Sequence, residues 1–178
     1  MQASTEIQDL LAEAWAKRRV EDYVAAKALV AQARELCTAD DFASLGRIYH
    51  IYMQFESDHD NLAEAIAYCC QSVGYYARSG MPGKVAHSTR HLADLQRESG
   101  LGEEALQNYR ASIAIYRSQS DVSPGNLANA LRGLALALEL VGEKEEAKMV
   151  WLETRDLYGA CGLDAGVDEA SQHIGTLT

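Results

Sequence analysis

Apolar residues recur along this chain every three to four positions, a spacing that places them on one face of an α-helix. The pattern is interrupted by short segments rich in glycine, serine or aspartate, at residues 57–60, 80–83 and 121–124. The chain contains only 2 prolines, so long uninterrupted helices are expected. The predicted helices cover residues 4–18, 24–36, 42–55, 61–76, 82–99, 105–116, 124–141, 147–157 and 164–176. The pattern therefore predicts an all-α protein.

Local signals at the helix ends support these bounds. Small polar side chains that accept hydrogen bonds from backbone N–H groups are typical of helix starts. The expected caps are Ser4 or Thr5 for the first helix, Thr38 or Asp40 for the third, and Ser123, which precedes Pro124, for the seventh. Glycine is typical of helix ends because it adopts the left-handed backbone conformation without strain. Gly100, Gly142 and Gly162 are therefore expected to terminate helices.

One sequence unit recurs through the chain. A small residue opens every second helix, and these residues are Ala26, Ala65, Ala105 and Ala147, separated by 39, 40 and 42 residues. In two copies an aromatic residue, Tyr109 or Trp151, follows four positions later and so lies on the same helix face. A single helical hairpin cannot bury its apolar face, whereas stacked hairpins build one continuous core. The spacing therefore predicts four stacked hairpins.

These residues resemble the tetratricopeptide repeat (TPR) family. Leu92–Ala93 and Leu134–Ala135 look like the large–small pair of the family's first helix, and the alanine–aromatic pairs look like the signature of its second helix. The first two hairpins match less well, because Glu13–Ala14 and Tyr52–Met53 replace the large–small pair. Separations of about 40 residues are similar to the long-repeat variants found in kinesin light chains.

The resemblance implies a right-handed α-solenoid of antiparallel helix hairpins. We expect one domain over residues 1–178, in which a C-terminal capping helix at 164–176 covers the open end of the array. The expected repeats are residues 4–38, 40–79, 82–118 and 124–161. Members of this family are usually non-enzymatic modules that bind a protein or peptide segment in a concave groove lined by the first helices.

Composition narrows the function further. The net charge of −10 argues against a nucleic-acid-binding surface, and no apolar run is long enough to span a membrane. The start of the chain lacks the basic head and apolar core of a secretion signal. The four cysteines, at 37, 69, 70 and 161, form no CxxC pair, so a cytoplasmic protein with reduced thiols is expected. No nucleotide-binding, nucleophile or metalloprotease motif occurs, so we expect neither enzymatic activity nor a cofactor.

The resemblance also implies which side chains face the groove. Its register selects positions 18, 15, 14 and 11 residues before each repeated alanine. The selected residues are Gln8, Leu11, Ala12, Trp15, Arg47, His50, Ile51, Gln54, His87, Arg90, His91, Asp94, Asn129, Arg132, Gly133 and Leu136. The candidate partner-binding residues among them are Trp15, Arg47, His50, His87, Arg90, His91, Asp94, Asn129 and Arg132. This set is basic within an acidic chain, so we expect it to bind an acidic or carboxylate-ended segment.

Three alternatives stay open at this point. The basic strip is equally described as a solvated face that Asp58, Asp94 and Glu98 partly neutralise. His87 and His91 lie four residues apart on one helix, the spacing of a two-histidine metal site, and His50 of the neighbouring hairpin could approach them, although no acidic or cysteine third ligand is evident from the sequence. The groove or an open end of the array could also mediate self-association into a homo-oligomer.

Overall fold

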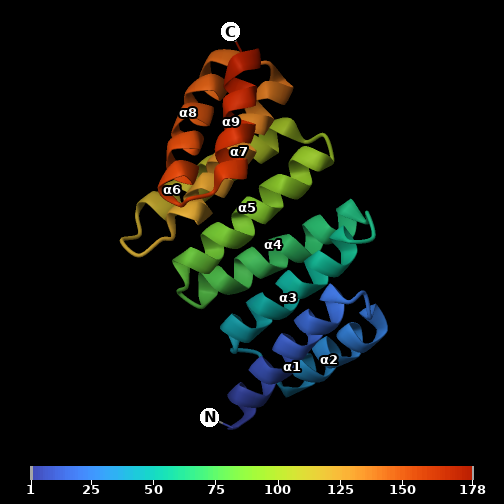
Figure 1. Ribbon diagram of the computed structural model, residues 1–178. Helices are drawn as coiled ribbons and strands as arrows, with labels where there is room; N and C mark the ends of the chain where they lie inside the picture. Colours follow the sequence, from blue (N-terminus) through green and yellow to red (C-terminus); the bar gives the residue numbers. More distant parts are fainter. Residues whose placement is uncertain (1, 178) are drawn as a thin grey trace. The chain divides into compact units, whose positions relative to one another are not determined.

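The computed structural model describes residues 2–177 of the chain. Every regular element in this range is an α-helix, which confirms the predicted all-α class. The helices are α1 (Gln2–Arg19), α2 (Tyr23–Leu36), α3 (Phe42–Ser57), α4 (Leu62–Arg78), α5 (Pro82–Glu98), α6 (Gly102–Arg117), α7 (Pro124–Val141), α8 (Lys144–Ala160) and α9 (Asp164–Thr176) (Figure 1).

The chain divides into two compact units after Ser88, within α5. In the first unit, α1 packs against α2, α3 packs against α4, and both α1 and α2 contact α3. In the second unit, α6 packs against α7, α7 against α8, and α8 against α9. Each unit is therefore built from consecutive helices that pack as neighbours, as expected for stacked helical hairpins.

The core of the first unit lies between α1, α2 and α3. Its buried residues are Ile7, Leu11, Ala14, Ala26, Val30, Ala33, Ile48, Ile51 and Phe55. Leu11 has no exposed surface, so the expectation that it faces a groove is wrong. Leu11 packs in the core formed with α2 and α3, whereas Gln8 and Trp15, each about one turn away on the same side of α1, stay partly exposed.

The second unit has its own core. Ala105, Tyr109, Ala147 and Trp151 are all fully buried, which confirms the structural role expected for the alanine–aromatic pairs. Trp151 packs with Ala135 and Ala170, and Ile174 and Leu177 pack against the same cluster from the C-terminal segment. The small residue admits the neighbouring helix, and the aromatic residue fills the space between helices. The capping helix is therefore present as α9 and covers this cluster.

The helix ends agree in part with the sequence-based expectations. Gly100, Gly142 and Gly162 have positive φ values of 77°, 85° and 68° and terminate α5, α7 and α8, as expected. Ser123 holds the N-cap position of α7 before Pro124. In the first unit, two turns place non-glycine residues in the left-handed region, at Glu21 (φ 60°) and Asp60 (φ 59°). Aspartate adopts this conformation more readily than most residues, whereas glutamate gives no such signal.

Two predicted caps are wrong. Helix α1 begins at Gln2, so Ser4 and Thr5 lie inside it rather than at its N-cap. Helix α3 is capped by Asp41, whose side chain accepts a hydrogen bond from the Ser44 N–H at 3.1 Å. Only the residue directly before the helix can reach that N–H, and Thr38 and Asp40 lie too far upstream. Within residues 2–177, no helix has the length and apolarity needed to cross a bilayer.

Candidate functional site

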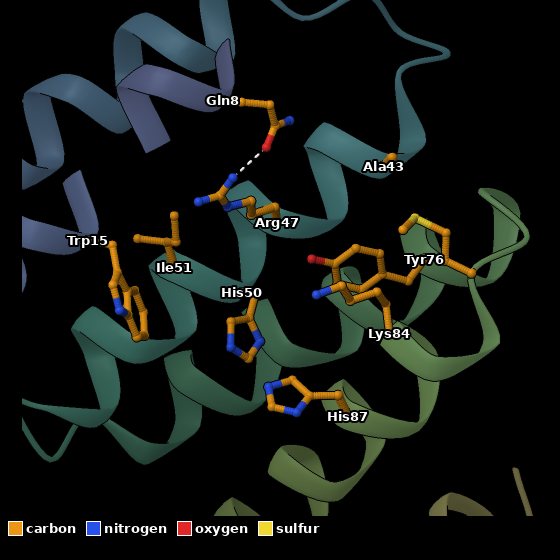
Figure 2. Close-up of a pocket in the computed structure, with 10 residues that line it drawn as sticks. Gln8, Trp15, Ala43, Arg47, His50, Ile51, Tyr76, Lys84 and His87 are labelled. Carbon is orange, nitrogen blue, oxygen red and sulfur yellow. Dashed lines mark hydrogen bonds between the residues drawn. The ribbon is translucent and has the colours of Figure 1, made fainter. Parts of the chain in front are cut away.

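A pocket with a volume of about 410 Å³ opens on the first unit (Figure 2). Its lining residues are Gln8, Trp15, Ala43, Arg47, His50, Ile51, Tyr76, Met81, Lys84 and His87. None of these lining residues is an aspartate or glutamate, although the chain as a whole carries a net charge of −10. The volume lies within the range of small-ligand and side-chain binding sites.

Two helices supply the basic side chains of the pocket. Arg47 and His50 are three residues apart on α3, and Lys84 and His87 are three residues apart at the start of α5. Residues at this spacing share one helix face, so each helix presents a base followed by a histidine. The imidazole rings of His50 and His87 meet between the two helices, with centroids 5.3 Å apart and planes inclined by 43°. Figure 2 shows these two rings side by side.

Arg47 is oriented by a neutral group. Its guanidinium donates a hydrogen bond to the side-chain oxygen of Gln8, on α1. The amide nitrogen of Gln8 in turn donates to the Ser44 hydroxyl at 3.4 Å, which keeps the amide oxygen turned toward Arg47. An amide holds the guanidinium in place without cancelling its charge, whereas a carboxylate would do both. The positive charge of Arg47 therefore remains available at the pocket.

The wall opposite α1 is fixed by Tyr76 and Ser88. The Tyr76 ring lies so close to Gly46 that an added Cβ there would stand 2.7 Å from the ring. Burial raises the pKa of the Tyr76 hydroxyl to about 12, against a smaller lowering effect of Arg47, so the phenol stays neutral at physiological pH. Ser88 holds one turn of α5 in place through two contacts with α4. Its backbone oxygen accepts a hydrogen bond from the Cys69 thiol, and its hydroxyl lies 3.1 Å from the Ser72 hydroxyl.

Trp15 closes the other end of the pocket. The Arg18 guanidinium lies over its ring, 4.7 Å from the centroid. Asp58 accepts two hydrogen bonds of 2.6 Å from Arg18, and Gln54 accepts a third at 2.9 Å. Asp58, one of the three acids expected to neutralise the basic strip, thus pairs with Arg18, outside the pocket. Trp15 contributes an apolar wall of fixed orientation.

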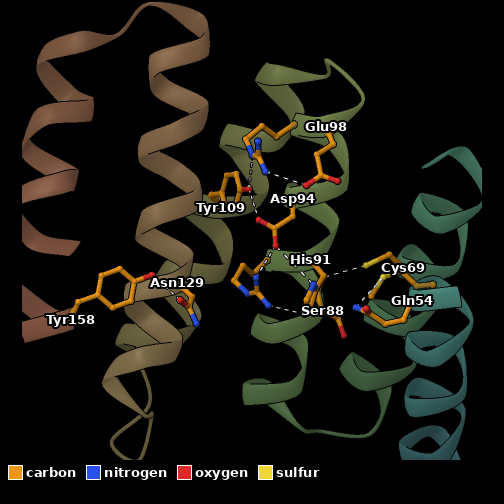
Figure 3. Close-up of polar contacts among 12 residues, drawn as sticks. Gln54, Cys69, Ser88, His91, Asp94, Glu98, Tyr109, Asn129 and Tyr158 are labelled. Carbon is orange, nitrogen blue, oxygen red and sulfur yellow. Dashed lines mark hydrogen bonds and ion pairs between the residues drawn. The ribbon is translucent and has the colours of Figure 1, made fainter. Parts of the chain in front are cut away.

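In the second unit, the candidate side chains on α5 are engaged with one another. Arg90 donates to Asp94 at 2.7 Å and to the Nε2 atom of His91 at 2.7 Å. Asp94 also accepts a 2.6 Å hydrogen bond from the Tyr109 hydroxyl, as Figure 3 shows. Burial raises the pKa of the Asp94 carboxyl, and Arg90 and Tyr109 oppose that shift. These contacts tie α5 to α6.

The candidate side chains on α7 are also held within the unit. Arg132 donates two hydrogen bonds to Glu169 of α9, at 2.7 and 2.5 Å. Asn129 accepts a 2.8 Å hydrogen bond from the Tyr158 hydroxyl (Figure 3). Gly133, which the sequence register places in the groove, is buried against the Tyr109 ring instead. The charge of Arg132 is thus matched by a carboxylate that the sequence analysis did not connect with it.

The pocket contains residues that sequence reasoning missed. Lys84, Tyr76 and Met81 line it, but none of them occupies a position that the family register selects. Lys84 could have been recognised from its spacing, because it precedes His87 by three residues in the first turn of α5. Tyr76 and Met81 carry no such signal, since they reach the pocket from the end of α4 and the following turn.

A metal site at His87 and His91 stays a prediction, and cationic side chains lie near both residues. His91 already accepts a hydrogen bond from the Arg90 guanidinium through Nε2, one of its two ligand atoms. His87 lines a pocket that also holds the cationic side chains of Arg47 and Lys84. A divalent cation would be repelled by these side chains, whereas an anion would be attracted.

The paired helices and buried alanine–aromatic contacts define a TPR-like helical-repeat fold of the α-solenoid class. The chain is similar to the crystal structure of BtubC (BKLC) from P. vanneervenii, with 14% identity, a TM-score of 0.68, and coverage of 99% of this chain and 89% of that one. It is also similar to a Podosopora anserina protein described as a kinesin light chain with nearly identical TPR-like repeats. That match has 16% identity, a TM-score of 0.66, and coverage of 99% and 97%.

No protein-family model matches the chain, and no curated protein matches it by sequence. The structural similarities therefore establish the fold, and the sequence resemblance to long TPR-like repeats is confirmed at that level.

Proposed function

We propose that this protein is a non-enzymatic protein-interaction module, and that the pocket of the first unit binds an acidic segment of a partner protein. The TPR-like fold supports the general part of this proposal, because helical-repeat proteins use extended surfaces to hold other chains. A soluble adaptor acting in the cytoplasm fits the composition described above.

The proposal that the pocket binds an acidic segment rests on the charge of Arg47. Arg47 is oriented by the neutral amide of Gln8, in a pocket whose lining includes Lys84 and no carboxylate. Arg90 and Arg132, the other arginines of the expected groove, are each paired with an acid. Of the three, Arg47 is thus best prepared to meet an incoming carboxylate, because its guanidinium is positioned and its charge is not cancelled.

The apolar lining residues indicate that the bound segment also carries an apolar side chain. Trp15 and Ile51 lie beside Arg47 and His50 (Figure 2), and Met81 also lines the pocket. A bound segment would place an acidic side chain between the bases and a neighbouring apolar side chain against these residues. Aromatic anchors of this kind contribute most of the binding energy in many interfaces.

Binding of degenerate peptide pools tests this function. We expect a pool with a central glutamate to bind the wild-type protein, and a pool with a central lysine not to bind. The double variant Arg47→Gln/Lys84→Gln should weaken binding by at least about tenfold, because two charge-assisted contacts are lost. A matched control is Arg110→Gln/Lys144→Gln, which removes the same charge at exposed positions outside the pocket. Equal loss in both variants, or no loss in either, would contradict the proposal.

Self-association is the alternative function. Light scattering on the purified protein separates the two, because an isolated chain has a mass of 19.5 kDa. A dimer or larger assembly that persists at low concentration and dissociates in Arg47→Gln/Lys84→Gln would favour self-association through the same pocket. A monomer that binds the glutamate pool would favour the adaptor function.

A further inference from the structure

We propose that the group for which this pocket is built is the phosphate of a phosphorylated serine or threonine in a partner segment. This inference rests on the proposed function, since it names the chemistry of the acidic group that the same pocket receives. Three features of the pocket support it: basic side chains on two helices, two fixed positive charges with no acid in the lining, and neutral polar residues around them.

The donors approach from two sides. Arg47 and His50 stand on α3, and Lys84 and His87 stand on α5, with the two imidazole rings 5.3 Å apart between them. A carboxylate offers two oxygens in one plane, whereas a phosphate monoester offers three terminal oxygens directed to different sides. Donors on two opposing helices therefore suit a phosphate better than a single carboxylate.

The charge balance points the same way. Arg47 and Lys84 supply two fixed positive charges, and no lining residue is acidic. A glutamate brings one negative charge, whereas a phosphoserine carries about −1.5 to −2 at pH 7. A dianionic group thus matches the pocket more closely than a monoanionic one.

The other polar residues that line the pocket are neutral, so they do not compete with a phosphate for Arg47 and Lys84. Burial raises the pKa of Tyr76 to about 12, so its hydroxyl remains a neutral donor in the lining of the pocket. Gln8 presents an amide to Arg47 rather than a carboxylate. Trp15, Ile51 and Met81 form the apolar part of the lining, where the chain on either side of a phosphorylated residue can pack.

A protein segment fits better than a nucleic acid. A nucleic acid would present many phosphates along its backbone, and a chain with a net charge of −10 would repel those lying beyond the pocket. One phosphorylated side chain places a single dianion in the pocket, and its uncharged or basic neighbours can lie against the acidic surface outside. The partner is therefore a phosphorylated protein segment.

Three degenerate peptide pools that differ only at a fixed central residue test this inference on the full-length chain. The central residue is phosphoserine, glutamate or serine, and inorganic phosphate serves as a competitor. We expect the phosphoserine pool to bind about tenfold more tightly than the glutamate pool, because one further charge-assisted contact is made, and the serine pool to bind weakest. Arg47→Gln and Lys84→Gln should each remove this preference, while Arg110→Gln, a single charge removal outside the pocket, should retain it.

The other outcomes separate this inference from the function on which it rests. If the phosphoserine and glutamate pools bind equally and Arg47→Gln weakens both, the phosphate inference is overturned and the acidic-segment function stands. If neither pool binds, both are overturned. A phosphoserine preference that survives in both pocket variants would show that the phosphate binds elsewhere. Inorganic phosphate that binds at Arg47 while the phosphoserine pool does not would overturn the assignment to a protein segment.

Discussion

The Tyr109 ring of α6 lies directly against Gly133 of α7, so closely that a Cβ atom at position 133 would overlap the ring. The same relationship recurs between Tyr76 and Gly46 and between Tyr158 and Gly166. In each case the ring fills the space left by a glycine on an adjacent helix, which is α3 for Tyr76, α7 for Tyr109 and the capping helix α9 for Tyr158. The missing side chain lets the ring enter, and the ring fills the gap between the helices.

Gly133→Ala should therefore destabilise the protein although alanine favours helix formation. Overpacking in a filled core costs about 1–3 kcal/mol, which exceeds the gain in helix propensity of about 1 kcal/mol. The matched control is Gly74→Ala in α4, where an added Cβ meets no atom within 4 Å. That control should stabilise the protein by about 0.5–1 kcal/mol. Urea unfolding of both variants measures the contrast, and a stabilised Gly133→Ala protein would contradict the packing described here.

Tyr109→Phe should also destabilise the protein, through the carboxylate of Asp94. The Tyr109 hydroxyl donates to Asp94 at 2.6 Å, and its loss leaves a buried carboxylate with fewer donors. A cost of about 1–3 kcal/mol is expected at neutral pH. The control is Tyr116→Phe on the same helix, because the buried Tyr116 hydroxyl has no hydrogen-bond partner among the described residues. Removing that hydroxyl should cost less than about 0.5 kcal/mol, so similar losses in the two variants would argue against a special role for Asp94.

The attachment of α9 should depend on pH through Glu169. The hydrogen bonds from Arg132 lower the pKa of Glu169 below its ordinary value of 4.5. A carboxyl whose pKa is lower in the folded state stabilises that state above its unfolded pKa, and this contribution is lost as the pH falls through the folded pKa. Glu169→Gln should therefore cost about 0.5–1 kcal/mol at pH 7, since the pair is partly exposed, and nearly nothing well below pH 4.5.

Unfolding by urea between pH 7 and pH 3 checks this dependence, and hydrogen exchange of the α9 amides shows whether the change is local. The control is Glu153→Gln, which breaks a more exposed pair with Arg117 and should change stability by less than about 0.5 kcal/mol at every pH. A pH-independent effect of Glu169→Gln would mean that Arg132 and Glu169 do not interact as an ion pair in solution.

Much of the fold could be predicted from the sequence, because the signals are local. The period of apolar residues determined the helices, and Gly100, Gly142 and Gly162 determined where three of them end. The recurrence of Ala26, Ala65, Ala105 and Ala147 determined the repeat, and each of these alanines is fully buried. Helix periodicity, end signals and small-residue contacts depend on neighbours within one or two turns, so the order of residues is sufficient to reveal them.

The charge partners were decided by the tertiary structure alone. The repeat register places Arg47 and Arg132 together in one basic strip, yet Arg47 meets Gln8, 39 residues away, and Arg132 meets Glu169, 37 residues away. Whether an arginine is neutralised by a carboxylate depends on which side chain the neighbouring helix presents to it. Small changes in helix register change that side chain. Long-range electrostatic pairing is thus set by the packing of the helices, whereas the helices themselves are set by local sequence.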